Sequence, residues 1–207
     1  KLRVPMLGGH LHPDPDMKIP SLSVAILGRA KKLLRSHLAE NGDDLILAVD
    51  LTGRPGCHSV VSWDANSGKT PEQLLHRLDI LPLIAEQNLS CAAKDISNAG
   101  ILGTISIFME NSGKGCHIRL DDIPRPASTG LKDWLHCFQS FGFILAVKPE
   151  NSKKVLELFS SRNIDANIIG KVIDNDRVVL EQKGTFSVLF DFKTDEITGI
   201  RYKGQVE

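Results

Sequence analysis

Apolar residues along this chain follow two spacings, one typical of buried strands and the other of amphipathic helices. Predominantly apolar runs occupy residues 45–51 and 142–148, a pattern that predicts strands covered on both faces. After Thr70 apolar residues recur every three or four positions, which predicts a helix with Thr70 as its N-cap and Pro71 in its first turn. Because proline has no N–H for the helical ladder, Pro82 predicts a kink.

The other apolar patterns complete a mixed α and β chain. Further strands are predicted at 2–7, 21–28, 117–123, 163–173, 176–182 and 186–192, and further helices at 99–110, 131–138 and 152–162. This alternation predicts an α+β fold, a mixed β-sheet covered by helices. The helices beginning near Thr70, Ala99 and Ser152 are expected on one face of that sheet. The strands at 2–7 and 21–28 are expected to lie outside this core.

Composition narrows the choice of partners. The chain has 207 residues, 42% of them hydrophobic, so it can bury a substantial core. Its 25 basic residues balance 25 acidic ones, which argues against nucleic acid or a membrane as partner and favours a small molecule. Cys57, Cys91, Cys116 and Cys137 form no C-x-x-C pair, which argues against a zinc knuckle or disulfide scaffold and favours a cytoplasmic protein. The chain begins with Lys1, which suggests a processed or truncated product.

The stretch KDISNAGILGT, residues 94–104, has two interpretations. In the first it is an ordinary helix start, where Ser97 or Asn98 accepts the free first-turn N–H groups and Gly100 permits close packing. In the second a phosphate binds at the helix N-terminus while Asp95 holds a Mg²⁺ ion. Both interpretations stay open on the residues alone.

Two loops carry further polar candidates. GGHLHPDPD at 8–16 contains two histidines and two aspartates. They could form a metal cluster, a loop that closes over a nucleotide or its metal, or a solvated connection between strands. The long loop 52–70 contains Arg54, His58, Trp63 and Asp64, which could hold a substrate. Alternatively, Trp63 pins this loop to the core.

The segment 91–126, CAAKDISNAGILGTISIFMENSGKGCHIRLDDIPRP, carries a family pattern. Its marks are a turn at Asp95, Ser97 and Gly100, a small-residue pair at Gly113 and Gly115, and an acidic strand at Leu120 and Asp121 leading to Pro124. Ile169, Gly170 and Val172 add a later strand. These residues resemble the C-terminal domain of the aminoimidazole ribonucleotide synthetase (AIR synthase) superfamily, which includes selenophosphate synthetase, thiamine-monophosphate kinase and a hydrogenase maturation factor. The resemblance is strongest to an uncharacterised synthetase-related branch.

The resemblance implies that residues 1–38 end an incomplete N-terminal ATP-binding domain and that 41–200 form the C-terminal domain. It implies a longer, homodimeric protein that is an ATP-dependent, Mg²⁺-requiring synthetase or kinase, acting on a small molecule by phosphoryl transfer or phosphate activation. ATP and Mg²⁺ are expected to bind mainly through the rest of the N-terminal domain, so this chain alone is expected to be inactive. The alternative is a non-catalytic binding or assembly module that retains the fold.

Site residues follow from the same resemblance. Asp95 corresponds to a magnesium ligand in selenophosphate synthetase-like relatives. The residues expected to contact nucleotide or substrate are His10, Ser97, Asn98 and Gly100, together with Arg54, His58 and Asp64, which are candidates because of their place in the long loop.

Overall fold

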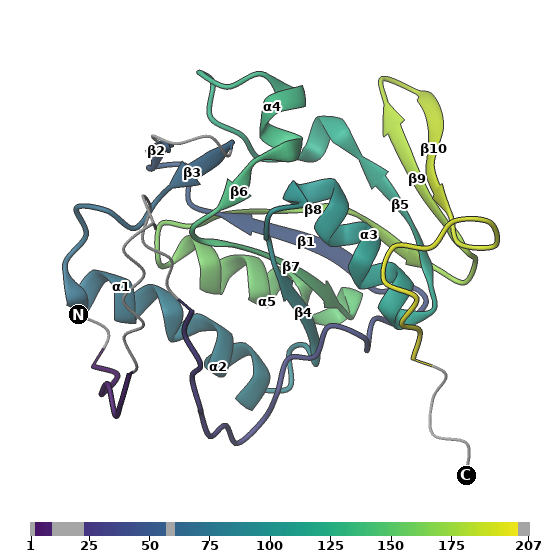
Figure 1. Cartoon of the computed structure of the whole chain (residues 1–207). Helices are drawn as coiled ribbons and strands as arrows, with labels where there is room; N and C mark the ends of the chain where they lie inside the picture. Colours follow the sequence, from purple (N-terminus) through teal and green to yellow (C-terminus); the bar gives the residue numbers. More distant parts are fainter. Residues whose placement is uncertain (1–2, 10–22, 57–60, 203–207) are drawn as a thin grey trace, which may run out of the picture.

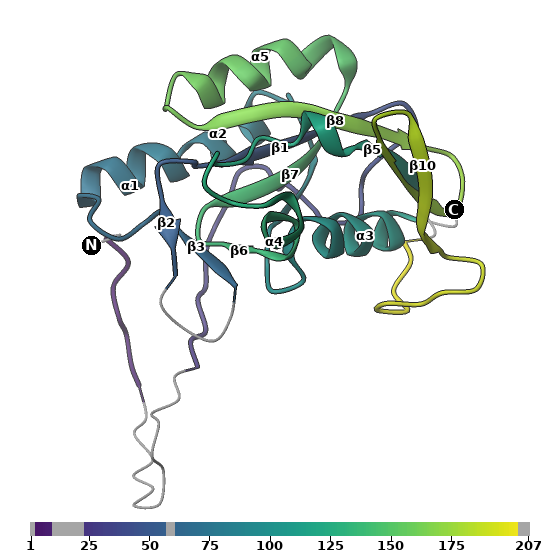
Figure 2. The same ribbon diagram turned by 90° about the horizontal axis from the view of Figure 1, so that it is seen from above.

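The molecule is built around one mixed β-sheet with helices on both faces (Figures 1 and 2). The computed structural model describes residues 3–9, 23–56 and 61–202. Across the seven-stranded sheet the order is β10 (Thr185–Asp191), β9 (Arg177–Gln182), β5 (Gly115–Arg119), β8 (Asp165–Ile173), β1 (Asp44–Val49), β7 (Gly142–Val147) and β4 (Ala92–Asp95). Strands β5 and β9 run parallel and the other neighbours antiparallel. The predicted α+β class with a mixed sheet is confirmed.

The helices are divided between the two faces of the sheet. One face carries α1 (Pro71–Leu78), α2 (Ile80–Glu86) and α5 (Pro149–Ser160), and the other carries α3 (Gly100–Ser112) and α4 (Leu131–His136) (Figure 2). The prediction that the helices cover a single face is wrong. All of β1 is buried, because an unbroken apolar strand presents apolar side chains to both faces and both must be covered. Phe159 of α5 and Phe108 of α3 are accordingly both fully buried.

The helix predicted after Thr70 is present but divided. Thr70 and Gln73 form a capping box, in which each side chain accepts the backbone N–H of the other residue. The helix breaks at Asp79, just before Pro82. Pro82 cannot donate an N–H to the Leu78 carbonyl and its ring crowds that carbonyl, so the predicted kink takes the form of a break. Within the described ranges, no helix combines the length and the apolar character needed to cross a bilayer.

The long loop 52–70 contains two short strands that the sequence pattern did not predict. β2 (Arg54–Pro55) pairs with β3 (Ser62–Asp64), which runs parallel to β6 (Phe138–Gln139). Trp63 is 4% exposed and packs edge-on against Trp134, with 5.3 Å between ring centroids. Its indole N–H donates to the Asp50 carbonyl at 2.8 Å. Trp63 therefore anchors the loop to the core.

The N-terminal strand predictions are wrong where the structure can be described. Residues 3–9 and 23–30 carry no strand or helix, and side chains such as Met6 and Leu27 are exposed. A strand needs a neighbour to satisfy its backbone groups, and these apolar runs pair with none of the described residues. Further on, Arg35 forms a parallel bridge to Ala92 at the outer edge of β4.

Candidate functional site

The candidate metal ligand Asp95 ends a strand. Residues 92–95 form the edge strand β4, in which Asp95 lies opposite Phe143 of β7. The sequence pattern placed these residues before a helix, because the four residues AAKD include no β-branched or aromatic side chain and give no strand signal of their own. The Asp95 side chain is 67% exposed, and its carboxylate lies 3.6 Å from the Lys94 ammonium.

The turn after Asp95 does not cap α3 as predicted. The N-cap residue is Ala99, and α3 has no side-chain cap hydrogen bond, so the capping role expected of Ser97 or Asn98 is wrong. The Ser97 backbone instead closes the turn: its carbonyl accepts the Gly100 N–H at 2.8 Å, and its N–H donates to the Thr104 hydroxyl at 3.3 Å. This arrangement leaves the first turn of α3 without a side-chain acceptor.

Gly100 has a packing role that explains why it is glycine. Its φ is +67°, and a Cβ atom at this position would lie 2.4 Å from the Leu135 carbonyl oxygen of α4. A larger residue would be strained and would push α4 away from the start of α3. The close packing expected of Gly100 is confirmed.

Asp95 lines a cleft of about 340 Å³ that lies between β4, α2 and the segment around Arg35. The cleft is lined by Leu34, Ser36, Leu81, Ala93, Lys94, Asp95 and Phe143. Its wall thus combines apolar side chains with one carboxylate and one ammonium group. Such a lining suits a small ligand that carries both an apolar and a charged part.

A buried charge cluster follows β1 at the same end of the sheet. Asp50 is 1% exposed and forms an ion pair with Arg77, which is 5% exposed, and another with Lys69 at 3.2 Å. The Thr52 N–H and hydroxyl donate to the Asp50 carboxylate at 2.8 and 2.6 Å. Burial acts to raise the pKa of Asp50, but the Thr52 hydrogen bonds and the Arg77 charge outweigh burial and lower it.

Sequence reasoning missed both Asp50 and Arg77. The available signal was a carboxylate placed directly after the buried run 45–49, where it must find a partner. The Arg77 guanidinium also lies 4.3 Å from the centroid of the Phe141 ring. The cluster therefore fixes the start of the 52–70 loop against α1.

Strand register brings this loop and the Asp95 turn to one end of the sheet. Val49 lies opposite Gly142, and Asp95 lies opposite Phe143, so both chain exits flank the start of β7. With adjacent strands about 4.8 Å apart, the backbones leaving β1 and β4 are roughly 10 Å from each other.

The predicted loop residues are only partly brought together. Arg54 and Asp64 face each other across β2 and β3, with 3.9 Å between Nε and Oδ2. The Asp64 Oδ1 atom accepts the N–H groups of Asn66 and Ser67 at 3.1 and 2.9 Å, and the Ser67 hydrogen bonds lower the pKa of Asp64. Asp64 therefore closes a turn. His10, His58 and the 8–16 histidine and aspartate candidates from position 10 onward lie outside the described residues.

The described residues do not by themselves fit a magnesium site. They contain no group of three or more His, Cys, Asp or Glu side chains that could hold a metal ion. Mg²⁺ prefers about six oxygen ligands in an octahedron, of which Asp95 could supply one or two.

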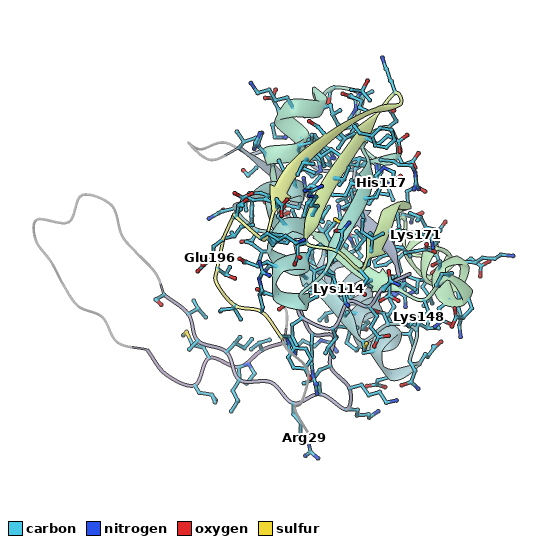
Figure 3. All side chains as sticks on the ribbon, turned by 90° about the vertical axis from the view of Figure 1, so that its right-hand side faces the viewer. Arg29, Lys114, His117, Lys148, Lys171 and Glu196 are labelled. Atoms are coloured by element: carbon cyan, nitrogen blue, oxygen red, sulfur yellow. The ribbon has the colours of Figure 1, made fainter. Side chains whose placement is uncertain are left out.

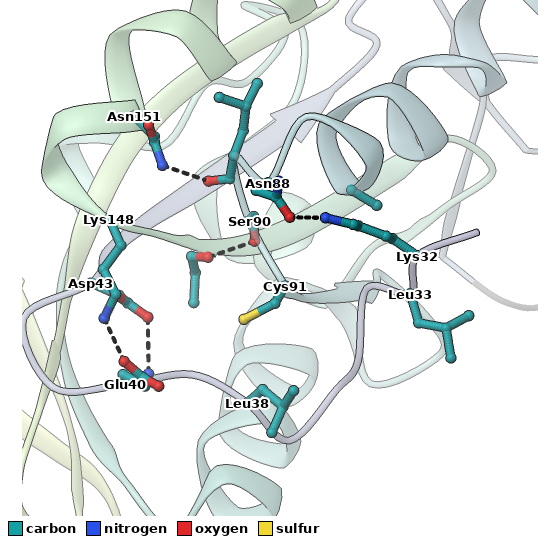
Figure 4. A pocket seen from close by; sticks show the side chains of 13 residues that line it. Lys32, Leu33, Leu38, Glu40, Asp43, Asn88, Ser90, Cys91, Lys148 and Asn151 are labelled. Carbon is teal, nitrogen blue, oxygen red and sulfur yellow. Dashed lines mark hydrogen bonds and ion pairs between the residues drawn. The ribbon is translucent and has the colours of Figure 1, made fainter. Parts of the chain in front are cut away.

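A second pocket, of about 180 Å³, lies at the opposite end of β4 (Figure 4). Lys148 bridges Glu40 and Asp43 there, at 2.6 and 3.0 Å, and these contacts raise the pKa of Lys148. Burial and the charges of Glu40 and Asp43 raise the pKa of the Cys91 thiol. Because a thiolate is disfavoured and the charges already pair with one another, this pocket is a poor candidate for a reactive centre.

The sequence itself matches a known family. Residues 40–183 match the family model of the AIR synthase related protein, C-terminal domain. The chain belongs to this family. An uncharacterized protein of Methanocaldococcus jannaschii is 36% identical over 201 residues, which cover 96% of this chain and 61% of the relative. The chain thus spans less than two thirds of that relative's length.

Solved structures with similar folds are more distant in sequence. PurL of T. maritima complexed with ATP aligns with a TM-score of 0.61 and 16% identity, over 75% of this chain and 26% of PurL. The hydrogenase maturation protein HypE in complex with ATP aligns with a TM-score of 0.56 and 16% identity, over 76% of this chain and 53% of HypE. These alignments confirm the fold of an AIR synthase-related C-terminal domain.

Proposed function

We propose that this AIR synthase-related domain belongs to an ATP-dependent, Mg²⁺-requiring synthetase or kinase that acts on a small molecule by phosphoryl transfer or phosphate activation. The observation that carries the proposal is the exposed Asp95 carboxylate, which opens into the cleft beside Lys94 just before the uncapped start of α3. The structural neighbours PurL and HypE, each solved with ATP, support a nucleotide as one ligand of the longer protein.

The groups available among the described residues indicate which ligand contacts this chain makes and which the rest of the longer protein makes. Phosphoryl transfer depends mainly on positioning and on neutralising the phosphate charge. Lys94 supplies a cation at the cleft, and the first-turn N–H groups of α3 supply donors that favour an anion. Since the described residues contain no group of three or more metal-ligating side chains, we assign most Mg²⁺ ligands and most nucleotide contacts to the rest of the longer protein. To this chain we assign the substrate side and one Mg²⁺ ligand, Asp95.

The test is Asp95→Asn in the longer protein, measured by ADP release with a panel of small amines and acids as acceptors. We expect turnover to fall by roughly 100-fold or more, the loss typical of weakening the electrostatic stabilisation of a transfer site, because the variant removes a ligand of the Mg²⁺ that neutralises the phosphoryl charge. Folding should change little, because Asp95 is an exposed residue whose ion pair with Lys94 is worth about 0–1 kcal/mol. A thermal melt checks this.

Asp165→Asn is the matched control. Asp165 is exposed and lies opposite Val49, at the same end of the sheet but on the far side of β1 from β4. It should keep full turnover. If both variants turn over ATP like the parent, Asp95 has no part in the reaction.

The alternative is a non-catalytic binding or assembly module. It is favoured because the cleft has a single carboxylate and because the described residues contain no group of three or more side chains that could hold a metal ion. That alternative predicts no ADP release by the parent protein with any acceptor of the panel.

A further inference from the structure

The strand β10 forms an outer edge of the sheet and presents apolar side chains to solvent. It is the first strand in the sheet order, and its residues lie beyond the 40–183 family match. Phe186 and Val188 are 61% and 53% exposed. Figure 3 shows the hairpin of β9 and β10 on the surface near His117, whose ring lies 5.6 Å from that of Phe186. An apolar edge strand of this kind is a template for pairing with another strand.

The hairpin turn determines which backbone groups face outward. Lys183 and Gly184 both have positive φ, 49° and 77°, and Gln182 lies opposite Thr185, as in a two-residue turn of type I′. Such a turn is closed by a hydrogen-bonded pair, after which bonded and non-bonded pairs alternate. Thr185 and Ser187 therefore bond to β9. The N–H and C=O groups of Phe186 and Val188 point away from the sheet.

We propose that β10 pairs antiparallel with β10 of a second copy of this chain, about a twofold axis at Ser187. In this register Phe186 of each copy lies opposite Val188 of the other, so their outward N–H and C=O groups bond to each other. The same register places an aromatic side chain beside a β-branched one on both sides of the axis, a favourable cross-strand pair.

Two criteria favour pairing about Ser187 over pairing about the adjacent residues Phe186 and Val188: the charges that face each other across the two strands, and the length over which the strands overlap. Pairing about Ser187 places Lys183 of one copy opposite Asp191 of the other. Pairing about Val188 would place Lys183 opposite Lys193, two like charges, and pairing about Phe186 would leave the ends of both strands unpaired beyond the turns. Asp191 already binds Arg177 of its own chain at 2.7 Å, so the Lys183 contact contributes mainly to register and little to affinity.

The first test measures association of the full chain by sedimentation equilibrium over a range of concentrations. We expect a monomer–dimer equilibrium that Val188→Lys weakens at least roughly tenfold, because a twofold axis makes each substitution act twice. Leu27→Lys is the matched control: Leu27 is 99% exposed but outside β10. It should leave the equilibrium unchanged. Circular dichroism melts confirm that both variants are folded, as expected for substitutions at exposed positions.

The second test reads the register directly, with Cys57 and Cys91 replaced by serine. In the proposed dimer, Ser187 of one copy lies opposite Ser187 of the other in a non-hydrogen-bonded pair. Cα atoms in such a pair are about 4.5 Å apart, which is within the range for a disulfide. Ser187→Cys should therefore cross-link under mild oxidation. Thr185→Cys and Leu189→Cys should each fail alone and cross-link when mixed. A chain that stays monomeric, or a dimer broken by Leu27→Lys but not by Val188→Lys, would overturn the proposal.

Discussion

Replacing Arg77 by alanine would leave the buried Asp50 carboxylate without its guanidinium partner. Removing one member of a buried ion pair typically costs about 3–5 kcal/mol, because the other charge stays desolvated. Lys69 remains 3.2 Å from Asp50, which places the expected loss near the lower end, about 3 kcal/mol. For a chain of this size that corresponds to a fall in melting temperature of roughly 6–12 °C.

Urea unfolding of the parent, Arg77→Ala, Asp50→Asn and the double variant forms a double-mutant cycle, which isolates the interaction energy of the Asp50–Arg77 pair from the other effects of each substitution. The double variant should lose less stability than the sum of the single variants, by about 2 kcal/mol, because each single variant leaves one charge unpaired. The reasoning is refuted if Arg77→Ala costs under about 1 kcal/mol, or if the single losses add without coupling.

The same pair predicts a pH dependence with a definite sign. The folded pKa of Asp50 is lowered below its unfolded value of about 3.9. Its contribution to stability is therefore fully present above about pH 4 and is lost as the pH falls through the folded pKa. Between pH 5 and 2 the parent should lose more stability than Asp50→Asn, as measured by urea midpoints.

Further outcomes concern the C-terminal segment and nucleotide binding. The buried Glu110 carboxylate accepts the N–H groups of Ile197 and Thr198, both at 2.8 Å, so Glu110→Gln should release residues 197–199 at a local cost of roughly 1.5–3 kcal/mol. Faster amide exchange there, with a nearly unchanged global melt, is the expected signature, and unaltered exchange contradicts it. Calorimetric titration of this chain alone should show weak or no Mg-ATP binding, because Asp95 is a single carboxylate. Micromolar affinity would place the nucleotide site within this chain.

Local sequence signals determined much of this fold. The unbroken apolar runs that became β1 and β7 required burial on both faces, and the Thr70 capping box with Pro71 fixed the start of α1. Gly113 ends α3 in the left-handed conformation that glycine adopts without strain. Each of these signals lies within a few residues of the structure it specifies, so the sequence alone was sufficient.

The candidate site depended instead on contacts between distant segments. The residues of β4 became a strand only because β7, which lies about fifty residues further along the chain, offered them a hydrogen-bonding partner. Ser97 and Asn98 do not cap α3, and Gly100 at its start is fitted closely against α4. Asp50 pairs with Arg77 because the fold sets α1 against the end of β1. Periodicity and turn chemistry describe the neighbours of a residue along the chain, whereas these contacts arise from how the sheet and helices pack, and only the tertiary structure decides them.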